Sequence, residues 1–171
     1  MPIGVKRNPL VAVDTNVLLD HANDDELVID ALATIRRRLP DCELIVTPTV
    51  VEEIVLKAER DDHALDRRLA QRVLAALVEP WGFRVVSFIP VGRGIVAEIA
   101  RRLRRQGMIP PGELNDSLIV AEAGLIGATL LMSSDAHIKD LDHAQLKLVL
   151  DSADAGTPLV ASPYKIVTQF F

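Results

Sequence analysis

The 171-residue chain has few aromatic residues and a single cysteine. The first shortage limits how the core can be built, and the second limits disulfide formation. Aromatic residues make up 4% of the sequence although 49% of all residues are hydrophobic, so the core has to be built from aliphatic side chains. Parallel sheets covered by helices on both faces have this aliphatic character. One cysteine, Cys42, excludes an internal disulfide and is typical of a reducing compartment.

Long hydrophobic runs are also missing. The longest apolar stretch, 117–132, is interrupted by Glu122 and is shorter than the roughly 20 residues that a membrane-spanning helix needs. The first residues, MPIGVKRNPL, lack the apolar core of a signal peptide. We therefore expect a soluble, cytoplasmic protein without a membrane partner, folded as a single domain over residues 1–171.

An excess of positive charge is absent as well. The formal net charge is −5, which is unusual for a protein that holds nucleic acid on a broad basic surface. A nuclease remains compatible with this charge, because metal-binding carboxylates themselves subtract several charges. The arginines are grouped at 36–38, 67–68 and 101–105. Such groups are either solvated helix faces or contacts for RNA phosphates.

Short apolar runs alternate with helical patterns along the chain. Strands are expected at residues 10–13, 43–46, 84–88, 129–132 and 158–161. Helices are expected at 14–21, 24–39, 47–60, 65–78, 94–106, 115–126 and 164–171. This alternation predicts a three-layer α/β/α fold with a central parallel sheet of four to five strands.

Acidic residues recur where these strands end. Asp14 directly follows the first strand, Asp135 follows the fourth, and Asp116 begins the helix at 115–126. Glu52 and Glu53 lie in the first turns of the helix after the second strand. Each residue alone fits a helix cap or a first-turn acid. However, parallel strands bring their carboxyl ends to one edge of the sheet, where sites form.

Carboxylates gathered at such an edge raise one another's pKa unless a cation neutralises them. Oxygen ligands favour Mg²⁺ or Mn²⁺, which usually take further ligands from water or a phosphate. Such an ion activates a water for attack on phosphorus. The acidic pattern therefore indicates a metal-dependent phosphoryl-transfer site.

Four segments in this order resemble the motifs of the PIN domain family: DTNVLLD, TPTVVEEIVLKA, NDSLIVAEA and LLMSSDAHI. The resemblance extends from residue 10 to the terminal SPYKIVTQFF. It implies a metal-dependent endoribonuclease that cuts RNA, similar to the VapC-type toxins of toxin–antitoxin pairs. It also implies an antitoxin protein as a partner and a homodimer.

The resemblance implies that four acidic residues are catalytic and hold Mg²⁺ or Mn²⁺: Asp14, Glu53, Asp116 and Asp135. Asn16 and Ser133 match a polar and a hydroxyl position of the family. Glu53 is preferred to Glu52 because the family's acid precedes an apolar residue, whereas helical periodicity does not separate the two. Asn16 either orients a water or holds Asp14 in place.

Other acidic residues and the histidines have plainer interpretations. Glu122 is neither three nor four residues from Asp116, so it should face elsewhere. Asp140 and Asp142 are expected to be solvated loop residues. The histidines are scattered and have no zinc-binding spacing: they are His21, His63, His137 and His143.

Two other interpretations of the chain stay open. A haloacid-dehalogenase-like phosphatase also has an aspartate after its first strand, but it needs a second aspartate where this chain has Asn16. A non-catalytic PIN-like scaffold that binds RNA or protein is the other alternative, although all four acidic positions are filled. A housekeeping RNA-processing nuclease is as compatible as a toxin, because the chain has extra length around 59–78.

Overall fold

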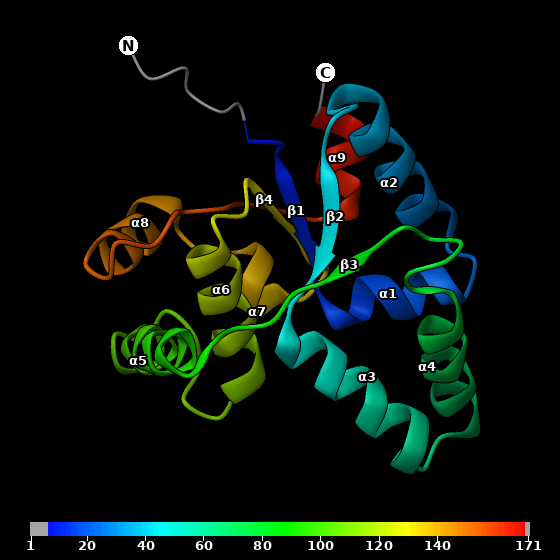
Figure 1. Ribbon diagram of the computed structural model, residues 1–171, viewed down its shortest axis with the longest axis horizontal. Coiled ribbons are helices and arrows are strands. Elements are labelled where there is room, and N and C mark those ends of the chain that lie inside the picture. The colour runs from blue at the N-terminus through cyan, green and yellow to red at the C-terminus, as the bar shows by residue number, and fades with distance from the viewer. Residues whose placement is uncertain (1–6, 170–171) are drawn as a thin grey trace.

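The sheet of the computed structural model, which describes residues 7–169, has the strand order β3-β2-β1-β4-β5, and every pair is parallel (Figure 1). The strands are β1 (Leu10–Val13), β2 (Glu43–Val46), β3 (Arg84–Val85), β4 (Leu130–Met132) and β5 (Leu159–Ala161). Val13 lies opposite Met132 in the register of β1 and β4. Asp14 and Ser133, the next residue on each strand, therefore leave the sheet side by side.

Helices cover both faces of this sheet. In chain order they are α1 (Thr15–Ala22), α2 (Glu26–Arg38), α3 (Pro48–Arg60), α4 (Ala64–Ala76), α5 (Pro90–Arg105), α6 (Leu114–Ile126), α7 (Ala136–Lys139), α8 (His143–Asp151) and α9 (Pro163–Gln169). Helices α2 and α9 lie on one side, and α5, α6 and α8 lie on the other (Figure 1). The expected three-layer α/β/α fold is confirmed. Within residues 7–169, no helix is long and apolar enough to cross a membrane.

The core is aliphatic, as the composition predicts. Val11, Ala12 and Val13 of the central strand are fully buried, and Phe83 is the aromatic side chain among the largest fully buried residues. A strand buried on both faces has to be apolar along its whole length. A carboxylate directly after such a strand is therefore drawn into the interior.

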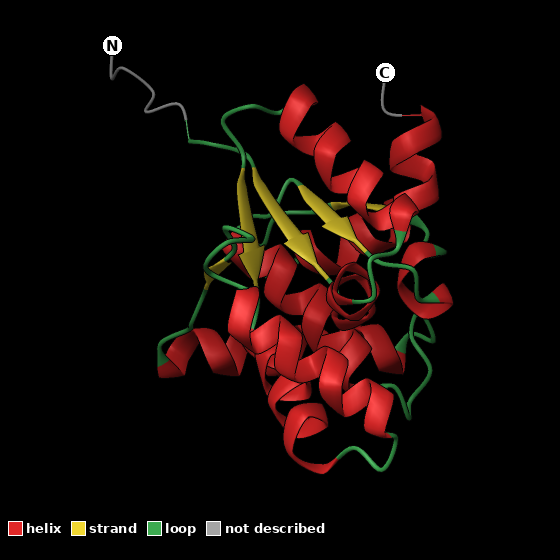
Figure 2. Ribbon diagram, turned by 90° about the vertical axis from the view of Figure 1, so that its right-hand side faces the viewer, coloured by secondary structure: helices red, strands yellow, loops and turns green. Residues whose placement is uncertain are grey.

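The structure changes several expected boundaries. Strand β3 pairs over two residues and not over 84–88, and α5 begins at Pro90 and not at residue 94. Proline suits the first turn of a helix because its missing N–H would be unpaired there. Helices α7 and α8 were not expected. Figure 2 shows the strands running toward the end of the molecule where several helices gather, so the carboxyl ends of the parallel strands lie at that end.

Candidate active site

Asp14 lies at the junction of β1 and α1 and is 3% exposed. Its Oδ1 accepts a hydrogen bond of 2.6 Å from the backbone N–H of Thr15. Its Oδ2 accepts a hydrogen bond of 2.7 Å from the hydroxyl of Ser133 at the end of β4. The same aspartate therefore caps a helix and connects the two central strands.

Burial raises the pKa of the Asp14 carboxyl to about 6. The hydrogen bonds from Ser133 and Thr15 lower this pKa, and the nearby charges of Glu53 and Asp116 raise it. A carboxylate that is buried beside other carboxylates favours a cation in its vicinity. The electrostatics at this position thus fit a metal ligand.

Glu53 points toward Asp14 from the neighbouring helix α3. One of its carboxylate oxygens accepts a hydrogen bond from the hydroxyl of Thr15, and the other accepts one of 2.8 Å from Nδ2 of Asn115. Glu52, one residue earlier, lines a different cleft of about 440 Å³. The choice of Glu53 over Glu52 that the sequence left to family resemblance therefore agrees with the side-chain positions.

Asp116 and Asp135 approach the same region from α6 and from the end of β4. Oδ1 of Asp135 accepts a hydrogen bond of 2.7 Å from the N–H of His137, so Asp135 also caps α7. Burial raises the pKa of Asp116, and the charges of Asp135 and Glu113 raise it further, while His137 lowers it.

These groups meet in a pocket of about 220 Å³ at the carboxyl edge of the sheet. It is lined by Asp14, Thr15, Asn16, Leu19, Glu53, Lys57, Asp116 and Asp135. Ser133 is fully buried just behind it, where its hydroxyl also accepts a hydrogen bond of 3.0 Å from the N–H of Asp135. Asn16 Oδ1 lies 3.5 Å from the backbone nitrogen of Ser134. The structure thus brings together all six residues that the sequence singled out.

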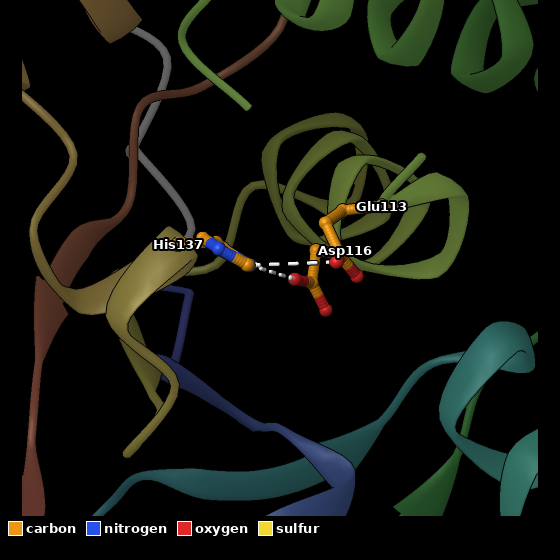
Figure 3. A group of neighbouring side chains, drawn as sticks. All are labelled: Glu113, Asp116 and His137. Atoms are coloured by element: carbon orange, nitrogen blue, oxygen red, sulfur yellow. Dashed lines mark hydrogen bonds and ion pairs between the residues drawn. The ribbon is translucent and has the colours of Figure 1, made fainter. Parts of the chain in front are cut away.

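Glu113 and His137 form a second group with Asp116 on one side of this pocket (Figure 3). Each contributes one ligand atom, and these atoms all lie within 4.8 Å of one another. Nδ1 of His137 lies 3.3 Å from Oδ2 of Asp116 and 3.9 Å from Oε1 of Glu113.

The sequence did not identify several of the residues in these two groups. Thr15 and Asn115 hold Glu53, and Lys57 adds a positive charge to the pocket. His137 was set aside because the histidines have no zinc-like spacing, and its neighbours come from a different helix. The position of Lys57 could have been predicted from the sequence, since it follows Glu53 by one helical turn and so lies on the same face of the helix.

The other acidic residues that the sequence analysis considered lie outside the acidic pocket. Glu122 is 5% exposed and accepts hydrogen bonds from the N–H and the hydroxyl of Thr49, so it caps α3 from α6 and faces away from Asp116 as expected. Asp140 is exposed, and Asp142 caps α8 through the N–H of Gln145. Neither Asp140 nor Asp142 lines the acidic pocket.

A carboxylate-lined pocket at the carboxyl edge of a parallel five-stranded sheet defines an α/β protein with a site suited to a divalent cation. The chain belongs to the PIN domain family, whose model matches residues 11–144. Comparison with curated proteins finds no relative by sequence.

Two solved structures are similar in fold. VapBC2 from Rickettsia felis, bound to a DNA fragment from its promoter, has a chain that is 13% identical, with a TM-score of 0.60. FitAcB from Neisseria gonorrhoeae has one that is 18% identical, with a TM-score of 0.56. Each match covers 90% of this chain and 98% of the other. At this level of identity the likeness establishes the fold.

Proposed function

We propose that this protein is a metal-dependent endoribonuclease, a single nuclease domain over residues 1–171 that hydrolyses RNA phosphodiester bonds. The observation that carries the proposal is the convergence of Asp14, Glu53, Asp116 and Asp135 on one small pocket. Membership of the PIN domain family supports it. Four carboxylates fit Mg²⁺ or Mn²⁺, which prefer oxygen ligands and keep positions for water and phosphate.

In this proposal the four carboxylates hold the cation, which when bound lowers the pKa of the attacking water and stabilises charge at phosphorus. Thr15 and Asn115 fix the Glu53 carboxylate, and Ser133 fixes Asp14. Lys57 offers a positive charge to a substrate phosphate at the pocket.

Asn16 and the arginines of α5 take supporting roles. The proximity of Asn16 to the Ser134 amide favours a role in holding the pocket together over one in orienting water. Arg104 donates to the hydroxyl of the fully buried Ser117, so this guanidinium is held against α6. Arg101 and Arg102 pair with Glu98, which fits the solvated face that is common for grouped arginines.

A role as the toxin of a toxin–antitoxin pair is the favoured biological setting. The similarity in fold to VapBC2 and FitAcB supports it. The proposed partners are an antitoxin protein and a second copy of this chain, and the proposed location is the cytoplasm.

Induced expression of wild type should then arrest growth, while Asp14→Asn should not. A light-scattering mass twice that of the chain should show the dimer.

The nuclease itself is tested by incubating the protein with a mixed pool of structured and unstructured RNA. Parallel reactions contain Mg²⁺, Mn²⁺ or EDTA, and single-stranded DNA replaces RNA in a further reaction. Wild type is compared with Asp14→Asn and Asp116→Asn, and Glu52→Gln serves as a matched control on the other side of α3. We expect RNA cleavage by wild type and by the control, with metal present.

Cleavage that persists in EDTA or in both aspartate variants would exclude the proposed site. A folded protein that binds neither Mg²⁺ nor Mn²⁺ and leaves RNA intact would be a non-catalytic scaffold. Release of inorganic phosphate from small phosphomonoesters without RNA cleavage would instead indicate a phosphatase.

A further inference from the structure

Glu113, Asp116 and His137 converge on one point from two helices. Glu113 immediately precedes α6, Asp116 lies in the first turn of α6, and His137 lies in the first turn of α7. Figure 3 shows the three side chains pointing toward one another. Their exposed fractions are 46%, 17% and 42%, so an ion from solvent can reach the group.

The Glu113 side chain does not cap the helix at whose N-terminus it lies. It occupies the N-cap of α6 but makes no capping hydrogen bond to that helix within the part of the chain described. The aspartates at the N-caps of α1, α2, α7 and α8 do cap their own helices. The carboxylate of Glu113 instead lies 3.9 Å from the His137 ring.

One ring nitrogen of His137 faces three carboxylates. Its Nδ1 lies 3.3 Å from Asp116, 3.5 Å from Asp135 and 3.9 Å from Glu113. A single nitrogen carries at most one proton, so it satisfies at most one of these acceptors by a hydrogen bond. The remaining negative charge favours a cation of higher charge than an imidazolium.

The spacing fits a transition-metal ion. Zinc–nitrogen and zinc–oxygen bonds are about 2.0–2.1 Å, which places neighbouring ligands of a tetrahedral site roughly 3.3 Å apart. The separation of His137 Nδ1 and Asp116 Oδ2 matches that value, and the solvent-accessible Glu113 is close enough to join them. Three protein ligands leave a fourth position for water.

We propose that Glu113, Asp116 and His137 form a second cation site that prefers Zn²⁺ or a similar transition ion to Mg²⁺. Imidazole is a good ligand for such ions, whereas Mg²⁺ prefers oxygen ligands alone. Asp116 belongs to both sites, so an ion here changes the charge at the acidic pocket. This second site is a separate proposal from the nuclease, because Zn²⁺ binding can be measured without RNA.

The test is Zn²⁺ titration by calorimetry in excess Mg²⁺, with Co²⁺ absorption as a spectroscopic report of an imidazole ligand. Wild type should bind one Zn²⁺ per chain. His137→Gln and Glu113→Gln should each weaken binding by at least about tenfold, since loss of even an outer-shell partner costs that much. Circular dichroism checks that each variant is folded.

Three matched variants test whether Zn²⁺ binds elsewhere on the chain. His143→Gln removes another exposed histidine, Cys42→Ser removes the thiol, and Asp14→Asn disables the proposed Mg²⁺ pocket. His143→Gln and Cys42→Ser should keep the Zn²⁺ affinity of wild type, and Asp14→Asn should still bind one Zn²⁺ per chain. Unchanged affinity in a folded His137→Gln variant would overturn the proposal and leave His137 as an ion-pair partner of the carboxylates. Loss of nuclease activity in Asp14→Asn with Zn²⁺ binding intact would show that the two proposals stand separately.

Discussion

The hydroxyl of Ser133 donates a hydrogen bond of 2.7 Å to Oδ2 of Asp14, two buried residues that are 119 positions apart in the chain. This bond favours the ionised form of Asp14, whereas burial favours the protonated form. Hydrogen bonds to charged groups contribute about 1.5–3 kcal/mol, which is large enough to affect the ionisation of Asp14.

Ser133→Ala should raise the pKa of Asp14 above its value of about 6 by about one unit, because one unit corresponds to about 1.4 kcal/mol. Carbon NMR titration of the Asp14 carboxyl in EDTA measures this pKa directly. Ser134→Ala removes an exposed hydroxyl next to it and should leave the pKa unchanged. Equal titration curves for Ser133→Ala and wild type would rule out this role for Ser133.

Asp14 should make the metal-free protein less stable as the pH rises. Its pKa is about 6 in the folded chain and about 3.9 when unfolded, so between these values the folded state binds more protons. The free energy of unfolding therefore falls as pH increases from about 4 to about 6, by up to about 3 kcal/mol. The contribution is present below the unfolded pKa and lost above the folded one.

Asp14→Asn should remove that dependence. In EDTA, the variant should be more stable than wild type at pH 8 and close to it at pH 4, as measured by urea unfolding. Asp116 and Glu122 also have raised pKa values, so the difference between the two proteins isolates Asp14. If the difference in unfolding free energy between wild type and Asp14→Asn were the same at pH 4 and pH 8, the raised pKa of Asp14 would be contradicted.

Glu53→Gln and Glu52→Gln should behave differently although the residues are adjacent. Glu53 lines the acidic pocket, and Glu52 lines the neighbouring cleft. Glu53→Gln should weaken Mn²⁺ binding at least about tenfold, because it removes a charged oxygen ligand. Glu52→Gln should stay within about twofold of wild type. Electron paramagnetic resonance of free Mn²⁺ gives both affinities, and similar losses in the two variants would refute the assignment.

Glu122→Leu should destabilise the fold by about 1–3 kcal/mol, because it leaves the buried N–H and hydroxyl of Thr49 without their acceptor. Glu122→Gln retains an acceptor oxygen and should cost less than about half of that. Thermal unfolding of the two variants at neutral pH provides the comparison. If Leu and Gln were equally tolerated, capping of α3 by Glu122 would not contribute to stability.

The sequence predicted the layers of this fold because the buried strands are apolar throughout and end abruptly in polar residues. Asp14 is the clearest case, since Val11, Ala12 and Val13 precede it without interruption. Strand β3 was predicted too long, because apolar residues that pack on the core after Val85 look like a continued strand. Pattern alone does not reveal where backbone pairing stops.

The acidic positions were predictable because each follows a strand or begins a helix, and parallel topology brings those points together. The choice between Glu52 and Glu53 could not be predicted from helical periodicity, because both residues lie on the flanks of the same apolar stripe. The group of Glu113 and His137 was also missed. Those residues are on separate helices, and their proximity follows from the packing of α7 against the end of α6.

The hydrogen bond between Ser133 and Asp14 also determines how much of the chain must be synthesised before the site can form. Asp14 is synthesised first, and its partner Ser133 at the end of β4 follows 119 positions later. A nascent polypeptide that ends before residue 133 lacks both the Ser133 partner of Asp14 and the Asp135 side chain that lines the acidic pocket. Under the proposed function, a chain synthesised only as far as β4 would therefore lack nuclease activity.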